Sequence, residues 1–151
     1  SIRDLRTNLE TLADEAHRSK DPELLTEAVR KSLARNITHK YMNETGEVPV
    51  ISLEPRIEEL LANSLLQTEH GVQLVMDPKQ AQALLSKISR SIEDHPEIAG
   101  QPILLTSATA RRHLYKLTSR FIPQLIVLSH NEISPDAQVQ SVGLVEMSHA
   151  G

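Results

Sequence analysis

The sequence predicts a fold between the α+β and α/β classes, with an N-terminal helical subdomain followed by an α/β subdomain that contains a βαβ unit. Apolar residues recur at helical spacing through the first forty residues, and strand and helix signals alternate after Gly46. Two uniformly apolar runs further on flank a helical pattern, as expected of parallel strands covered on both faces. We therefore expect two subdomains, residues 1–46 and 47–151.

Two amphipathic helices are expected in the helical subdomain. Residues 1–17 carry an apolar residue at every third or fourth position, which predicts the first helix. Asp21-Pro22-Glu23 then supplies an N-cap oxygen, a proline at the first helical position and an early acid. The second helix should run to about Tyr41, before a turn at Asn43–Glu47. Its inward residues are expected to be Leu25, Val29, Leu33 and Ile37.

The α/β subdomain is expected to begin with a strand and a helix. Val48–Leu53 is rich in β-branched residues, and Pro49, which has no backbone N–H to donate, indicates an edge strand. Pro55 opens a helix, and an alternating strand should follow Gly71. The inward residues of the helix are expected to be Ile57, Leu60, Leu61 and Leu65, and the alternating residues of the strand are Val72, Leu74 and Met76.

A capped helix and the βαβ unit complete the subdomain. Asp77-Pro78 repeats the cap and proline, and the helix should end before His95-Pro96, because helical conformation is disfavoured before a proline. Ile103–Thr106 and Leu125–Leu128 are the expected strands of the βαβ unit, and Val139–Val145 is the last strand. On the helix between the βαβ strands, the residues expected in the core are Leu114, Leu117 and Phe121.

Composition argues against several classes of function. The chain of 151 residues has no cysteine, so disulfides, thiolate metal sites and cysteine nucleophiles are absent. Aromatic residues make up 2% and the net charge is −4, which disfavours nucleic-acid binding because that function uses stacking rings and a basic balance. No apolar run is long enough for a membrane-spanning helix, so a soluble chain is expected.

Motifs for catalysis are also missing. The turn Ser107–Ala110 after an apolar strand contains no glycine, so it resembles neither a P-loop nor a dinucleotide-binding turn. No serine is flanked by the glycines of a nucleophile elbow. The seven histidines are dispersed without a helical i, i+4 pair, so neither a metal nor another cofactor is expected. We expect no enzymatic activity.

The most pointed feature is a basic stripe on the helix of the βαβ unit. Arg112, Lys116 and Arg120 are spaced i, i+4 and i+8, and Arg111 lies one step round the helix. No acidic residue occurs between Ile98 and Asn131. Like charges at this spacing cost about 0.2–0.5 kcal/mol per pair in an isolated helix, a cost that an acidic partner could reverse. The alternative is a solvated face whose methylenes cover apolar surface.

His130 is a further candidate, because it follows the second strand of the βαβ unit. Open α/β sheets commonly bind ligands at the carboxyl ends of their strands. No second acid or base is spaced to cooperate with His130, which favours a structural role.

Several blocks along the chain carry a family resemblance. They are Ser1–Thr7, Leu9–Ala13, Asp21-Pro22, Leu25–Glu27, Val29-Arg30, Leu33–Arg35, Gln67–Gly71, Leu74–Pro78, Pro102–Ser107, Arg111-Arg112 and Val127–Ile133. In this order they resemble the FlhA family, the export-gate proteins of flagellar type III secretion. Ser129–Ile133 and Gln140–Val145 look flagellar, whereas injectisome export gates, which share the architecture, are the close alternative. Ala16–Lys20 departs from the His-Ala-Pro segment that flagellar members often carry.

The resemblance implies a non-enzymatic scaffold and docking module without a cofactor. The chain would be the last two of four cytoplasmic subdomains of a bacterial inner-membrane protein. The membrane region and the main pocket for chaperones and export substrates would lie in the missing N-terminal part. The helical subdomain would join neighbouring subunits in a homo-oligomeric ring, and the α/β subdomain would face the export ATPase complex and its stalk protein. Candidate partner-binding residues are Arg111, Arg112, Lys116, Arg120, His130, Asn131 and Glu132.

A competing hypothesis comes from a different class of function. The βαβ region, with His130 and the basic helix, could belong to an enzyme domain that binds a small molecule or anion. The missing glycine loops and acid–base pairs argue against it. We also expect weak or no self-association of the isolated chain, because ring closure joins two different surfaces of neighbouring subunits.

Overall fold

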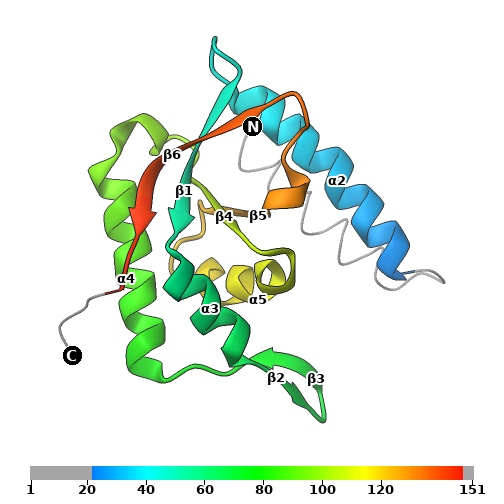
Figure 1. Cartoon of the computed structure of the whole chain (residues 1–151), viewed down its shortest axis with the longest axis vertical. Helices are drawn as coiled ribbons and strands as arrows, with labels where there is room; N and C mark the ends of the chain where they lie inside the picture. The colour runs from blue at the N-terminus through cyan, green and yellow to red at the C-terminus, as the bar shows by residue number, and fades with distance from the viewer. Residues whose placement is uncertain (1–21, 148–151) are drawn as a thin grey trace. The chain divides into compact units, whose positions relative to one another are not determined.

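A computed structural model describes residues 22–147, and the helix expected in residues 1–17 lies outside them. The chain divides into two compact units (Figure 1). The first unit comprises residues 1–48 and 131–139, and the second comprises residues 49–130 and 140–151. The independence of subdomains 1–46 and 47–151 stays a prediction.

The first unit is built around helix α2, which spans Pro22–Tyr41 as expected. Of the expected inward residues, Ile37 is fully buried, and Val29 and Leu33 are half-buried. The side chain of Leu25 is not among those that the structure describes. The buried face of α2 is shifted by one position from the expected stripe, and it includes one polar and one charged residue. Its buried members are Arg30, Ala34, Ile37 and Thr38.

The turn after α2 forms as predicted. The Asn43 side-chain Oδ1 accepts hydrogen bonds from the backbone N–H of Thr45 (3.0 Å) and of Glu47 (2.9 Å). Gly46 has φ +82°, a left-handed conformation that favours glycine. These bonds and this glycine reverse the chain into the first strand.

The second unit contains most of a four-stranded sheet with the order β5-β4-β1-β6. The strands are β1 (Glu47–Leu53), β4 (Ile103–Thr106), β5 (Ile126–Ser129) and β6 (Gln138–Val145). Strands β4 and β5 are parallel neighbours joined by α5 (Ala108–Ser119), which confirms the βαβ unit. The observed fold is therefore the mixed α/β arrangement that the sequence predicts.

The expectation that Pro49 marks an edge strand is wrong, because β1 lies between β4 and β6. The parallel register pairs Ile51 of β1 with Leu104 of β4. Continuing that register puts Pro49 level with Pro102, one residue before β4 begins. The missing N–H of Pro49 thus falls outside the β1–β4 pairing.

Helix α3 (Pro55–Ser64) leads into a hairpin of which the sequence predicted only the second strand, after Gly71. Strands β2 (Leu65–Thr68) and β3 (Gly71–Leu74) form a separate antiparallel sheet, which extends beyond the end of α3 in Figure 1. Leu65 therefore belongs to a strand rather than to α3. The short strand expected after Gly71 is confirmed as β3, and its Val72 is 46% exposed, because this hairpin lies outside the main sheet.

Helices α3, α4 (Pro78–Asp94) and α5 contribute to the hydrophobic core of the second unit. The Asp77 cap of α4 is confirmed, since its Oδ1 accepts a hydrogen bond from the Lys79 N–H at 2.9 Å. Phe121 is a correction: it is 67% exposed, because α5 ends at Ser119 and Ile122 takes the buried place. No helix within residues 22–147 is long and apolar enough to cross a membrane.

Candidate docking surface

Helix α5 has a fixed orientation within the second unit. The Ser107 side chain caps its first turn by accepting a hydrogen bond from the Ala110 N–H at 3.2 Å. Just before the cap, the Thr106 hydroxyl donates to Glu58 of α3 at 3.1 Å. Leu114 and Thr118 are fully buried. These contacts determine which side chains of α5 face solvent.

The basic stripe, defined here as Arg112, Lys116 and Arg120, lies on the solvent side. Arg112 and Lys116 are exposed residues of α5, and Arg120 is exposed immediately after the helix. No ion pair joins any of the three to another residue in the described part of the chain. No acidic side chain among those residues therefore compensates the like-charge repulsion that was inferred from the sequence.

The other candidate residues are placed differently. Arg111 is a buried residue of α5, so it is separate from the stripe. His130 and Asn131 are exposed after β5. Glu132 is buried, and its carboxylate binds Arg30 of α2 with an Nε–Oε2 distance of 2.9 Å. Asn131 and Glu132 belong to the first unit and His130 to the second.

Beside the stripe lies a hollow of about 370 Å³, which we call the basic hollow. The β2–β3 hairpin contributes His70, Val72, Gln73 and Leu74, and α5 contributes Arg112, His113, Lys116 and Leu117. Sequence reasoning missed the contribution of the hairpin to this hollow, because it did not predict strand β2. Two imidazoles and two cations thus line one concave surface whose lining contains no acid.

His113 is the titratable group most affected by this surrounding. Burial lowers its pKa from the ordinary value of 6.5, and the positive charges of Arg112, Lys116 and Arg111 lower it further. The imidazole is therefore mainly neutral at pH 7. The permanent positive charge of the basic hollow comes from Arg112 and Lys116.

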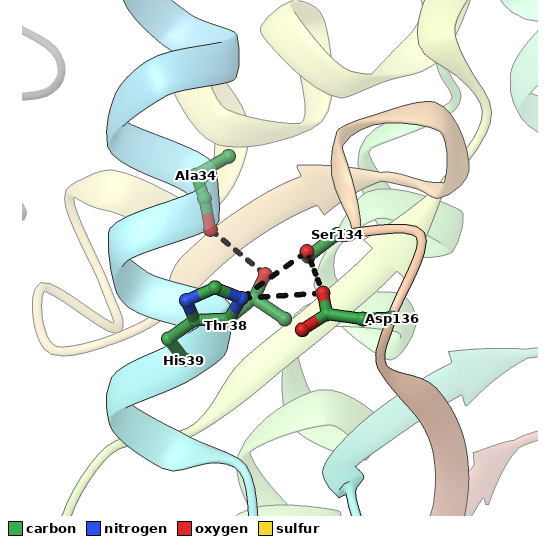
Figure 2. Close-up of polar contacts among 5 residues, drawn as sticks. All are labelled: Ala34, Thr38, His39, Ser134 and Asp136. Atoms are coloured by element: carbon green, nitrogen blue, oxygen red, sulfur yellow. Dashed lines mark hydrogen bonds and ion pairs between the residues drawn. The ribbon is translucent and has the colours of Figure 1, made fainter.

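A polar cluster in the first unit has the residue types of a catalytic triad. Its members are Ser134, His39 and Asp136. Figure 2 shows the His39 ring of α2 directed toward Ser134 and Asp136 of the loop after η2 (His130–Glu132). His39 Nε2 lies 3.2 Å from Asp136 Oδ1 and 3.3 Å from Ser134 Oγ. The Ser134 hydroxyl donates a short hydrogen bond to the same Asp136 oxygen.

This geometry differs from that of a triad in two respects. A triad histidine uses one ring nitrogen for the serine and the other for the aspartate, whereas here Nε2 faces both. The Ser134 proton is directed to Asp136 rather than to a base. The hydrogen bonds from Ser134 and then His39 lower the pKa of Asp136 below its ordinary value. The cluster holds the loop to α2, and no metal-binding cluster occurs among the described residues.

Comparison with known proteins shows a clear relationship. A model of the FHIPEP family matches residues 1–138. The flagellar biosynthesis protein FlhA of Bacillus subtilis (strain 168) is 35% identical over 147 residues, or 97% of this chain. The chain spans 22% of the length of that relative.

Solved structures agree with the sequence match. A structure of the Chlamydia pneumoniae CdsV and CdsO protein complex has 37% identity and a TM-score of 0.70, covering 97% of this chain and 43% of the other. The nonameric EscV cytosolic domain from the type III secretion system has 30% identity and a TM-score of 0.62, covering 97% and 43%. The observed fold therefore occurs within a longer chain in both structures, one of which is the EscV cytosolic domain from the type III secretion system.

Proposed function

Because the chain belongs to the FHIPEP family, we propose that it is a non-enzymatic scaffold and docking part of a type III protein export gate. Its similarity to FlhA favours the flagellar apparatus, and an injectisome gate is the alternative. The chain corresponds to about a fifth of a FlhA relative, so it acts as a piece of a longer protein. It works at the cytoplasmic face of the inner membrane, with the membrane region outside the present chain.

The observation that carries the docking role is the basic stripe. Arg112, Lys116 and Arg120 are exposed along α5 and its C-terminal end, and the lining of the basic hollow, which includes Arg112 and Lys116, contains no acid to neutralise them. We assign this surface to an acidic partner in the export ATPase complex, namely its stalk protein. The structure in which CdsV is in complex with CdsO supports the idea that such domains bind a second protein.

Assembly into a ring is the second part of the proposal. The EscV cytosolic domain is nonameric, which supports contacts between neighbouring subunits in the full-length protein. We assign these contacts to residues 1–46. Export chaperones and substrates dock mainly on parts of the longer protein that precede this chain. The isolated chain self-associates weakly, since a heterologous interface needs both of its surfaces.

Charge reversal tests the docking role directly. In a triple variant, Arg112→Glu, Lys116→Glu and Arg120→Glu are combined, and affinity for the purified stalk protein is measured by titration calorimetry. We expect at least a tenfold loss of affinity and a weaker salt dependence, because the complementary charges are removed. The fold should remain intact, since surface changes usually stay within about 0.5 kcal/mol.

A matched control reverses three exposed cations that are not part of the stripe and should leave the affinity unchanged. These are Arg35, Lys40 and Lys79, each replaced by glutamate. Wild-type affinity of the stripe variant, with normal export in cells, contradicts the proposal. A thermal-shift screen tests the competing enzyme hypothesis, because a ligand at 100 times its dissociation constant adds about 2.7 kcal/mol. We expect no shift with nucleotides or sugar phosphates.

A further inference from the structure

A second concave surface lies on the other side of Leu117. It is a groove of about 670 Å³ between α4 and the end of α5, which we call the apolar groove. Ala81 and Leu85 of α4 line it together with Leu117, Phe121 and Ile122. Arg90 and Glu93 add one charge of each sign at its α4 side. The groove is open and mainly apolar, as in sites that receive a segment of another protein.

Phe121 is the feature of this groove that requires an explanation. It is the only phenylalanine in the sequence, yet 67% of it is exposed. Aromatic side chains bury a large area at little entropic cost and are frequent anchors of protein interfaces. An exposed ring on the wall of an apolar groove is therefore suited to bind a partner's apolar side chains.

The apolar groove continues the basic stripe rather than forming a separate surface. His113 and Leu117 are spaced i, i+4 on α5, so they lie along one side of the helix, next to Arg112 and Lys116 at 100° per residue. Phe121 follows the end of the helix and lines the apolar groove together with Leu117. Leu117 lines both the basic hollow and the apolar groove. One helix thus presents an apolar track bordered on one side by cations.

We propose that this combined surface binds an amphipathic helix of a partner protein that carries acidic residues along one flank. The partner's apolar face packs on Leu85, Leu117 and Phe121, and its carboxylates meet Arg112, Lys116 and Arg120. The inference rests on the proposed function, because the basic stripe supplies half of the contact. It adds the secondary structure of the bound segment and its apolar anchor.

Charge complementarity determines this choice of occupant. The border of the track carries Arg112, Lys116 and Arg120, and the lining of the basic hollow contains no acid. A helix fits because the apolar track runs along α5, and a partner helix laid along it presents its apolar side chains at i, i+3, i+4 and i+7. A basic or uniformly apolar helix leaves the cations of the stripe unpaired.

The probe is a synthetic helical peptide with leucine at i, i+3, i+4 and i+7 and glutamate along one flank. Two matched peptides carry lysine on that flank or scramble the same composition so that no apolar face forms. Binding to the isotopically labelled chain is followed by NMR. We expect the acidic helix to bind at least tenfold more tightly than either control, with shifts concentrated at Leu85, Leu117 and Phe121.

A single substitution then tests the anchor. Phe121→Ser should weaken binding of the acidic peptide about 30-fold, the size of a typical interface hot spot. Leu66→Ser changes a comparably exposed apolar residue outside both surfaces and should leave binding unchanged. Thermal unfolding checks that both variants are folded. Equal binding of the scrambled peptide, shifts at other residues, or wild-type affinity of the Phe121 variant overturns the inference.

The stalk protein separates this inference from the proposed function. If charge reversal of the stripe weakens stalk binding but Phe121→Ser does not, the inference is overturned and the proposed function stands. If Phe121→Ser weakens it but charge reversal does not, the basic contact of the proposed function fails, together with the acidic flank inferred here. Loss of binding in both variants supports both.

Discussion

The ion pair between Arg30 and Glu132 connects two segments that are 102 residues apart in the sequence. Arg30 lies on α2, and Glu132 follows β5 in the segment that joins the first unit. The guanidinium contacts both carboxylate oxygens, with Nε–Oε2 at 2.9 Å and Nη2–Oε1 at 3.4 Å. Both side chains are only 8% exposed, so water screens the pair poorly.

Replacing Glu132 by glutamine keeps the shape of the side chain and removes its charge, so the buried guanidinium loses its ion pair with Glu132. Breaking a buried pair in this way usually costs about 3–5 kcal/mol. Because the pair retains some exposure and one bond is long, we expect the lower end, about 3 kcal/mol. That loss lowers the melting temperature by about 6–12 °C for a chain of this size.

The assay is chemical denaturation followed by circular dichroism, together with hydrogen exchange of the α2 amides, which reports on the first unit alone. Replacing Glu69, an exposed acid of the hairpin, by glutamine is the matched control and should cost less than about 0.5 kcal/mol. The double variant Arg30→Met with Glu132→Leu removes both charges and should recover much of the loss. A loss below about 1 kcal/mol for Glu132→Gln refutes the reasoning.

Two further predictions concern a close approach and a titration. A Cβ at Gly143 would contact Ser91 Oγ and lie 3.2 Å from His95 Cε1, so Gly143→Ala should cost about 1–3 kcal/mol in urea denaturation, and adding Ser91→Ala should restore part of it. No recovery in the double variant argues against that contact. The lowered pKa of Asp136 means that its ionised form stabilises the fold above pH 3.8, and this contribution disappears as pH falls through the folded-state pKa. The stability gap between wild type and Asp136→Asn should therefore shrink as acid is added, and a gap independent of pH contradicts the assignment.

Local signals of the sequence predicted most helices and the βαβ unit correctly. The Asp77-Pro78 cap and the start of α4 depend on neighbouring residues, as does the turn around Gly46, so the chain itself specifies them. The continuous apolar runs at Ile103 and Leu125 identified the parallel strands within one residue. In each case the determining interaction spans only a few residues.

The errors arose where distant residues decide the outcome. Arg30 is buried in an ion pair with Glu132, and the spacing of apolar residues in α2 contains no sign of that partner. Pro49 occurs in an interior strand because the register with β4 leaves its position unpaired on that side. Strand β3 was predicted, whereas β2 was missed because Leu65 continues the helical spacing of α3, and the cross-strand pairs of the hairpin form only in three dimensions.

The same distinction explains which half of the candidate surface the sequence revealed. Arg112 and Lys116 belong to α5 and Arg120 caps its C-terminal end, so their spacing in the sequence alone shows a shared side. The apolar groove requires Leu85 of α4 beside Leu117 of α5, and it also requires that α5 end before Phe121. Helical spacing extended past Ser119 assigns Phe121 to the core. The sequence therefore does not show that Phe121 is exposed or that it is suited to be an anchor. A search for docking surfaces from sequence should therefore examine large apolar residues just beyond a helix end that lies next to a stripe of like charge.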